Sequence, residues 1–155
     1  MIEINVISVG SVKEKYMQEL ISDYKKRITK YAKIDLIELK DESNKINENV
    51  VKELEGERII ASIKDGFYVV LLDIQGSMLD SVGLSKKIDE IATYNSSKIA
   101  FVIGGSLGVS EAVKKRANFK LSFSKMTFPH QLAKGILLEQ IYRSFKISNN
   151  ETYHK

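Results

Sequence analysis

The chain has 155 residues, enough for one domain with its own hydrophobic core. Hydrophobic residues make up 43% and charged residues 28%, a globular balance that excludes a wholly disordered chain. Cysteine is absent, which excludes disulfides, a thiolate nucleophile and a cysteine-based zinc site. We therefore expect residues 1–155 to form a single domain.

Charge is divided unevenly along the chain. Residues 1–97 carry 14 Lys and Arg against 17 Asp and Glu, whereas residues 98–155 carry 10 against 3. The second part is suited to a polyanion such as RNA, although a solvated basic surface explains the charge equally well. The N-terminus has no long apolar segment, so we expect a cytoplasmic protein that does not enter a membrane.

Two hydrophobic periodicities alternate along the first half of the chain. Strands have apolar residues at every second position or in a continuous run, and helices have them every three to four positions. The expected elements are a strand over residues 2–10, an amphipathic helix over 13–31, a strand over 34–39, a surface loop with a mobile tip over 40–47, and a helix to about residue 63.

The second half continues this alternation. Its continuous apolar runs are typical of strands buried on both faces of a parallel sheet, and its serines and single proline are suited to helix starts. The expected elements are a strand over residues 67–72, a helix from Ser81 to about residue 94, a strand over 99–103, a helix from Ser110 to about residue 117, a strand over 121–123, and a helix that begins at Pro129.

Strands that alternate with helices predict an α/β fold with a mostly parallel sheet and helices on both faces. Ligands of such sheets bind outside the carboxyl ends of the strands. Three segments are therefore candidate binding loops, residues 72–76, 104–108 and 123–130. Their glycines would let backbone approach a ligand closely, although a single glycine more often only makes a turn.

Common nucleotide and metal motifs are missing. The chain has neither a GxxxxGK[ST] sequence nor a GxGxxG sequence after its first strand, which argues against ATP hydrolysis and dinucleotide chemistry. Its only histidines are His130 and His154, and HExxH is absent. We therefore predict no metal site.

A serine hydrolase is one alternative. Residues 104–108 match the GxSxG nucleophile motif, and they lie between a predicted strand and a predicted helix. Ser106 would attack, and Glu139 or Glu151 with His154 would complete a triad. The chain is short for that fold and has no HGGG oxyanion loop, so we keep the hydrolase only as an alternative.

Six short segments carry a more specific signal: residues 9–10, 72–76, 101–105, 121–131, 142–143 and 153–155. With them the whole chain resembles the RlmH-type family of SPOUT methyltransferases. The resemblance implies a C-terminal trefoil knot, a rarity among folds, together with a homodimer and S-adenosylmethionine as the methyl donor.

The resemblance also implies the substrate and the cofactor contacts. The substrate would be N3 of a pseudouridine in the helix 69 loop of 23S rRNA, methylated in the assembled ribosome, which suits the basic second part of the chain. The implied cofactor contacts are Leu72, Gly104, Phe123, Ser124, Lys125, Met126, Thr127 and Phe128. A non-catalytic, ribosome-associated RNA-binding module remains a further alternative.

Methylation at N3 requires that its proton leaves, so a nearby base or cation would help. We expect Arg143 to hold phosphate or the developing anion, and His130, Tyr153 and His154 to contact the base or remove the proton. Two of these residues have an equally good structural explanation: Arg143 could pair with Glu139, and His130 could cap a helix or pack.

The polar tail over residues 148–155 should fray without core contacts. We therefore expect a partner to order it. Action of the tail within its own chain and action across the dimer both stay open.

Overall fold

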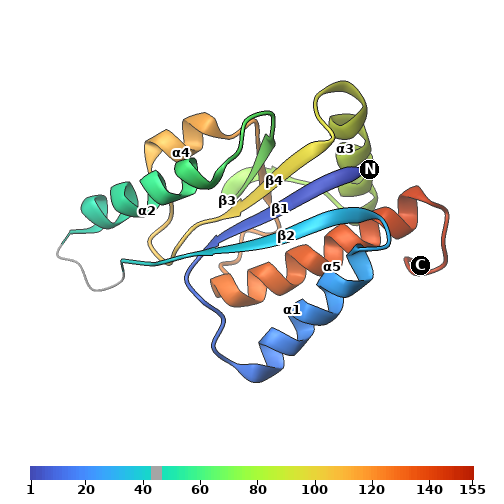
Figure 1. Ribbon diagram of the computed structural model, residues 1–155, viewed down its shortest axis with the longest axis horizontal. Coiled ribbons are helices and arrows are strands. Elements are labelled where there is room, and N and C mark those ends of the chain that lie inside the picture. The colour runs from blue at the N-terminus through green and yellow to red at the C-terminus, as the bar shows by residue number, and fades with distance from the viewer. Residues whose placement is uncertain (43–46) are drawn as a thin grey trace.

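The structure is a computed structural model that describes residues 1–42 and 47–155. Five parallel strands form one sheet in the order β2-β1-β4-β3-β5. Strands and helices alternate along the described chain (Figure 1), which confirms the predicted α/β fold. The elements are β1 (Ile2–Val9), α1 (Lys15–Ile28), β2 (Ala32–Leu39), α2 (Glu48–Ser62), β3 (Tyr68–Met78), α3 (Ser81–Tyr94), β4 (Lys98–Ile103), α4 (Glu111–Arg116), β5 (Phe119–Ser122) and α5 (His130–Ser148).

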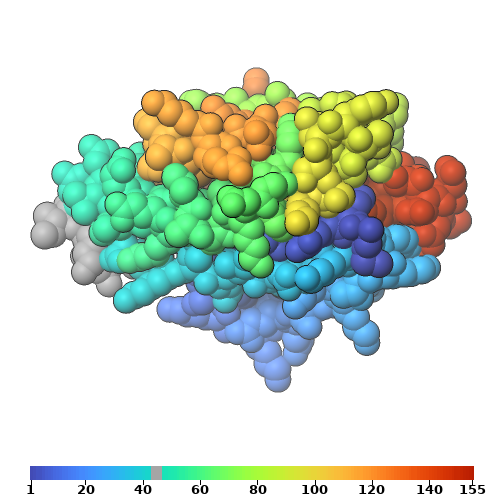
Figure 2. All heavy atoms as spheres, turned by 45° about the horizontal axis from the view of Figure 1, so that its top comes forward, coloured from blue at the N-terminus to red at the C-terminus, as the bar shows by residue number. Residues whose placement is uncertain are grey.

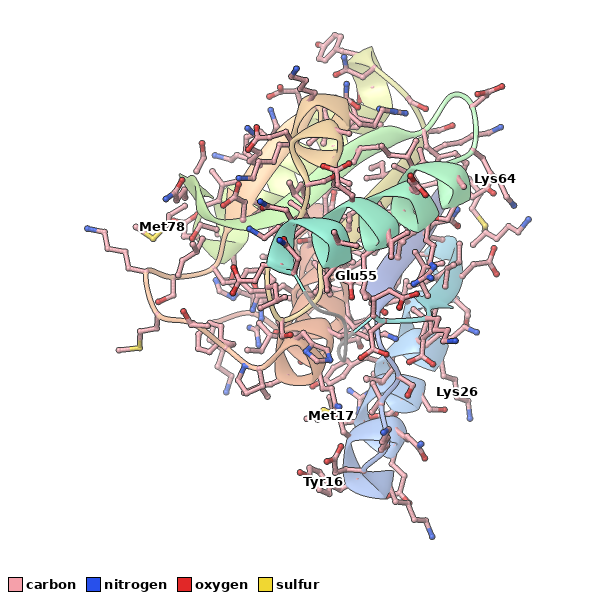
Figure 3. All side chains as sticks on the ribbon, turned by 90° about the vertical axis from the view of Figure 1, so that its left-hand side faces the viewer. Tyr16, Met17, Lys26, Glu55, Lys64 and Met78 are labelled. Carbon is pink, nitrogen blue, oxygen red and sulfur yellow. The ribbon has the colours of Figure 1, made fainter. Side chains whose placement is uncertain are left out.

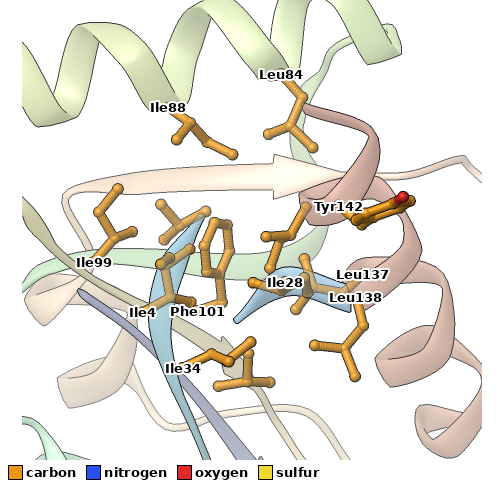
Figure 4. Packing of buried hydrophobic residues seen from close by; sticks show 14 of the residues in the cluster. Ile4, Ile28, Ile34, Leu84, Ile88, Ile99, Phe101, Leu137, Leu138 and Tyr142 are labelled. Carbon is orange, nitrogen blue, oxygen red and sulfur yellow. The ribbon is translucent and has the colours of Figure 1, made fainter. Parts of the chain in front are cut away.

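Helices cover both faces of the sheet, as predicted. Alternate residues of β4 point to opposite faces: Phe101 packs on the side of α1, α3 and α5, and Val102 packs on the side of α2 and α4. Figure 4 shows Phe101 of β4 in one cluster with Leu84 of α3 and Leu137 of α5. Full burial of such a side chain stabilises the fold by about 1.5–3 kcal/mol. On the other face α2 and α4 lie side by side (Figure 2).

β3 extends to Met78, well beyond the predicted end at residue 72. Its register with β5 shifts between Leu72 and Ser77, because the intervening residues leave the ladder before the chain rejoins β5. A Cβ on Gly76 would lie 2.7 Å from the carbonyl carbon of Lys120, so the two backbones approach closely there. These contacts do not test the trefoil knot, which stays a prediction.

Two helix caps were predicted, and only one is confirmed. Ser110 caps α4, because its Oγ accepts the N–H of Val113 at 3.3 Å. The prediction for Ser81 was wrong: Asp80 caps α3 by accepting the N–H of Gly83, and the Ser81 hydroxyl instead hydrogen-bonds Gln140. An aspartate one residue earlier is an equally good cap, so sequence alone could not choose between them.

Two further predictions concern segments outside the core. The tip of the predicted surface loop falls on residues 43–46, which lie outside the described residues. Within the described chain no helix combines the length and the apolar character needed to cross a bilayer.

Candidate active site

The carboxyl ends of β3, β4 and β5 surround a cavity of about 800 Å³. Its walls come from residues 72–75, 103–109, 121–124 and 126–130, so the structure brings together the three loops predicted from the sequence. Lys52 of α2 and Lys114 of α4 complete the wall on the side of the second loop.

The second loop, residues 104–108, is a tight turn whose glycines lie where a side chain would be crowded or strained. Gly108 has a φ of +92°, and its N–H donates to the carbonyl of Gly105 at 3.1 Å. A Cβ on Gly104 would lie 2.5 Å from Cγ1 of Val109. Gly105 is in contact with the buried Glu55, whose Oε1 would lie 2.6 Å from a Cβ there. The turn therefore presents backbone to the cavity at close range.

Seven of the eight cofactor contacts implied by the resemblance line this cavity: Leu72, Gly104, Phe123, Ser124, Met126, Thr127 and Phe128. Lys125 is exposed and does not line it. Ser124 forms a local turn by accepting the N–H of Met126 at 3.0 Å, which leaves the Met126 side chain 73% exposed at the cavity. A role for these residues in cofactor binding stays a prediction.

His130 also lines the cavity, as the first residue of α5. Its imidazole packs against Gly10, where a Cβ would lie 3.2 Å from Nε2. Gly10 has a φ of +95°, so a side chain there would be strained as well as crowded. Pro129 occupies the N-cap position without a side-chain cap hydrogen bond, so His130 packs and does not cap.

Three other predicted catalytic residues form a second cluster around Glu139, which we call the tail cluster: Glu139, Arg143, Tyr153 and His154. Glu139 accepts from Arg143 at 2.6 Å and from the Tyr153 hydroxyl at 2.7 Å. Arg143 Nη1 lies 3.1 Å from His154 Nδ1, and its guanidinium lies 4.7 Å from the centre of the Tyr153 ring. The pairing of Arg143 with Glu139 that the helical spacing allowed is therefore present.

This network shifts the pKa values of its members. Burial opposes ionisation of Glu139, but hydrogen bonds from Arg143 and Tyr153 outweigh it and hold the pKa of Glu139 below its ordinary value. Burial and the hydrogen bond to Glu139 raise the pKa of Tyr153 above that of a free tyrosine. Tyr153 is thus a protonated donor at neutral pH and cannot accept a proton in this arrangement.

The tail is ordered by contacts within its own chain, so the prediction that only a partner would order it was wrong. Glu151 accepts from the Tyr31 hydroxyl at 2.8 Å and from Lys146 at 3.2 Å. The rings of Tyr142 and Tyr153 meet edge to face at 4.9 Å. Tyr31, in the turn after α1, and Tyr142 of α5 therefore provide the core contacts that the polar tail itself lacks.

The four predicted catalytic residues belong to two separate groups within one chain. His130 begins α5, and Arg143 lies 13 residues later, from 130 to 143, on the same helix. At 1.5 Å per residue these positions are about 20 Å apart. Figure 1 shows the C-terminal end of α5 near the opposite end of the strands from the point where α5 begins.

This separation counts against the serine hydrolase. Ser106 is exposed on the cavity turn, whereas His154 lies with Arg143 in the tail cluster. Of the two candidate acids, Glu139 accepts from Arg143 and Tyr153, and Glu151 accepts from Tyr31 and Lys146. The chain does not assemble the nucleophile, acid and histidine at one point.

One charged pair was not anticipated from the sequence. Lys134 of α5 is 3% exposed and donates to Glu38 Oε2 at 3.2 Å. Helix periodicity does not indicate that Lys134 is buried, because lysines are almost always solvated. Among residues 1–42 and 47–155, no group of three His, Asp or Glu side chains is arranged to hold a metal ion.

Known proteins resemble the chain over nearly its whole length. A family model described as "Predicted SPOUT methyltransferase" matches residues 2–154. Proteins named "Ribosomal RNA large subunit methyltransferase H" from Clostridium botulinum and Alkaliphilus oremlandii are 53% and 54% identical over 157 positions, which cover 98% of this chain and 99% of theirs. The namesake from Bacillus pumilus is 51% identical with the same coverage. The chain therefore belongs to the SPOUT methyltransferase family and is an enzyme of that class.

Proposed function

We propose that this enzyme transfers a methyl group from S-adenosylmethionine to N3 of a pseudouridine in the helix 69 loop of 23S rRNA within the assembled ribosome. The observation that carries the proposal is the cavity at the carboxyl ends of the strands. The names of the relatives, which specify ribosomal RNA of the large subunit, support the substrate class. A ribosomal target would place the enzyme in the cytoplasm.

The residues around the cavity fit this methyl donor. A volume of about 800 Å³ lies within the range of small-molecule sites. Exposed backbone at Gly104 and Gly105 can hydrogen-bond the edge of adenine, and Phe123 and Phe128 offer apolar surface to its faces. S-adenosylmethionine supplies an already activated methyl group. The protein's task is therefore to orient the two substrates and to exclude water.

The transfer forms an N3–C bond, breaks the C–S bond of the donor and releases the N3 proton. Among the four predicted catalytic residues, His130 is the one at the cavity of its own chain, and an imidazole is suited to accept that proton. Lys52 and Lys114 at the cavity, together with the basic second part of the chain, favour a phosphate-rich substrate.

A homodimer would resolve the distance between the cavity and the tail cluster. A second copy can bring its own Arg143, Tyr153 and His154 to the cavity of the first. Apolar side chains remain exposed for such a contact, and Tyr16 and Met78 project outward at the periphery (Figure 3). A second cavity of about 350 Å³ between the start of α3 and α5 adds apolar surface. The exposed apolar residues near α1, α3 and α5 include Tyr16, Leu20, Met78, Leu79, Val82 and Leu132.

Calorimetric titration with S-adenosylmethionine and S-adenosylhomocysteine tests the cofactor. We expect saturable binding in wild type, and its loss in Gly104→Val and Met126→Arg. Met126 is exposed, so its substitution keeps the fold while placing bulk and positive charge at the cavity. Tyr94→Arg, at an exposed position on the end of α3, is the matched control and should bind normally. Absence of binding in wild type would instead favour the non-catalytic RNA-binding module.

Mixing two inactive variants tests the shared site. Met126→Arg disables the cavity and Arg143→Ala disables the tail cluster, so a mixed dimer retains one intact site if the tail acts across the dimer. Methyl transfer to ribosomes should therefore reappear on mixing. If the mixture stays as inactive as its components, the tail does not act across the dimer.

A further inference from the structure

Lys134 is a buried cation to which the proposed reaction gives no role. It lies one helical turn after His130 on α5, and its side chain is 4% exposed. Within the described residues its only carboxylate partner is Glu38, at the end of β2. A buried charge costs free energy even when it is paired, and an apolar residue often serves stability equally well. Its presence in the core therefore points to a task other than stability.

Glu38 connects Lys134 to the turn that follows β1. The Oε2 atom that accepts from Lys134 also accepts the backbone N–H of Val12 at 3.3 Å. Gln131, next to His130 on α5, donates to the carbonyl of Ser11 at 3.3 Å. The turn is thus held from two sides at adjacent residues.

His130 rests on this same turn. Gly10 precedes Ser11, and its missing side chain leaves the space in which the imidazole packs. A movement of the turn would therefore move the surface that supports His130. The ring lies at the wall of the cavity, where such a movement would change its distance to a bound substrate.

We propose that Lys134 is a positioning residue for His130, acting through Glu38 and the turn over residues 10–12. Lys134 does not line the cavity, so it does not contact the substrates directly. The kinetic consequence rests on the proposed function, whereas the structural consequence can be tested without it.

Proton NMR provides the structural test, because the chain has only two histidines. A His154→Ala variant identifies the ring signals of His130. We expect a nuclear Overhauser contact between the His130 ring and the Gly10 α-protons in wild type and in Lys134→Arg, which keeps the pairing with Glu38. The contact should be lost in Lys134→Met, and its persistence there would overturn the proposal. Lys98→Met, at an exposed position, controls for loss of a lysine.

Two features keep this test independent of unfolding. Methionine fills the space of the lysine stem, and Glu38 is 42% exposed, so water can solvate its carboxylate once Lys134 is gone. Glu38→Leu breaks the same link from a partly exposed position and should remove the same contact. If Glu38→Leu keeps the contact, the link through Glu38 is wrong.

Methyl transfer to ribosomes provides the kinetic test. We expect kcat to fall about tenfold to a hundredfold in Lys134→Met, because small displacements of a reacting group are that costly. Cofactor affinity should not change, Lys134→Arg should restore turnover, and Lys134→Met/Glu38→Leu should be no worse than either single variant. Full turnover in Lys134→Met would refute the inference. Absence of turnover in wild type would contradict the proposed function instead, and NMR would then decide the positioning role alone.

Discussion

The two ends of α5 differ in the way they use polar groups. At the first end, the cavity is walled by glycine-rich backbone and apolar rings, and the nearby lysines Lys52 and Lys114 lie at its edge. At the other end, Glu139 is shared between Arg143 and Tyr153, and Glu151 between Tyr31 and Lys146. The first end offers volume and closely approaching backbone, and the second offers charged groups that already satisfy one another.

The two ends differ in what they can bind within one chain. A preformed cavity can take a small ligand without rearrangement. The ion pair of the tail cluster is half-buried and its charged groups are already paired, so under the proposed function it acts only when another molecule meets it. The proposed homodimer would bring the tail cluster of one chain to the cavity of another, and the following predictions test each end in turn.

The largest effect is expected from Gly76→Ala, at the strand that walls the cavity. The added Cβ would lie 2.7 Å from backbone atoms of Lys120, and neither strand can yield without breaking the ladder. We expect a loss of about 3 kcal/mol or more in the free energy of unfolding, measured by urea denaturation. Gly66→Ala is the control: its φ is +84° but its surroundings are open, so only backbone strain of about 1 kcal/mol applies. Equal stability of the two variants would contradict the close approach.

The close approach at Gly76 also marks the limit of prediction for the fold. Periodicity gave the number, order and type of the elements, because each strand and helix has its own apolar pattern. It could not give the extension of β3 to Met78, which depends on pairing with β5, a segment more than forty residues later. Ser81 was misassigned as a cap for a simpler reason, since Asp80 beside it has the same capping chemistry.

At the other end of α5, Arg143→Ala should reduce methyl transfer about a hundredfold while cofactor affinity stays at the wild-type value. Arg143 binds Glu139 through two nitrogens and also approaches His154, so its loss removes the charge and releases both partners. Arg143→Lys keeps the positive charge but lacks the planar guanidinium that binds Glu139 through two nitrogens. We expect an intermediate rate of methyl transfer. Single-turnover transfer to ribosomes measures this, and wild-type rates in Arg143→Ala would remove the tail cluster from the mechanism.

A smaller effect is expected from Tyr153→Phe, which removes the hydrogen bond to Glu139 at a cost of about 1 kcal/mol in unfolding free energy. The pKa of Tyr153 is raised in the folded chain. The stabilisation that its hydroxyl gives the fold is therefore full below the ordinary tyrosine pKa of about 10 and is lost as pH rises beyond it. The pKa of Glu139 is lowered, so its contribution is full above the ordinary value of about 4.3 and is lost as pH falls. Wild type and Tyr153→Phe are compared by urea denaturation from pH 3 to 11. Their unfolding free energies should differ most between the two ordinary pKa values, and a pH-independent difference would refute the linkage.

The sequence correctly predicts that the three loops meet, because topology fixes them, and it misses contacts that packing fixes. The rule that ligands bind at the carboxyl ends of parallel strands is enough to select the three cavity loops from the order of strands and helices. The chemistry of N3 methylation groups His130 with Arg143, and the helical pattern gives no indication that the two ends of α5 serve different regions. The order of the tail was missed because it depends on packing. The ring of Tyr142, which contacts Tyr153, lies on α5 and not in the tail itself.

The smallest effect is expected from Ser106→Ala, and it separates the methyltransferase from the hydrolase. Ser106 is exposed on the cavity turn, so we expect methyl transfer at the wild-type rate and a stability within about 0.5 kcal/mol of wild type. Ser110→Ala is the matched control, because Ser110 is 4% exposed and caps α4; its loss should cost about 1 kcal/mol in thermal unfolding. A serine-reactive probe that labels wild type but not Ser106→Ala would show that the GxSxG turn holds an activated nucleophile. Since the described contacts leave Ser106 without a histidine, we expect no such labelling, and the glycines on both sides of Ser106 then serve to bring backbone close to a ligand.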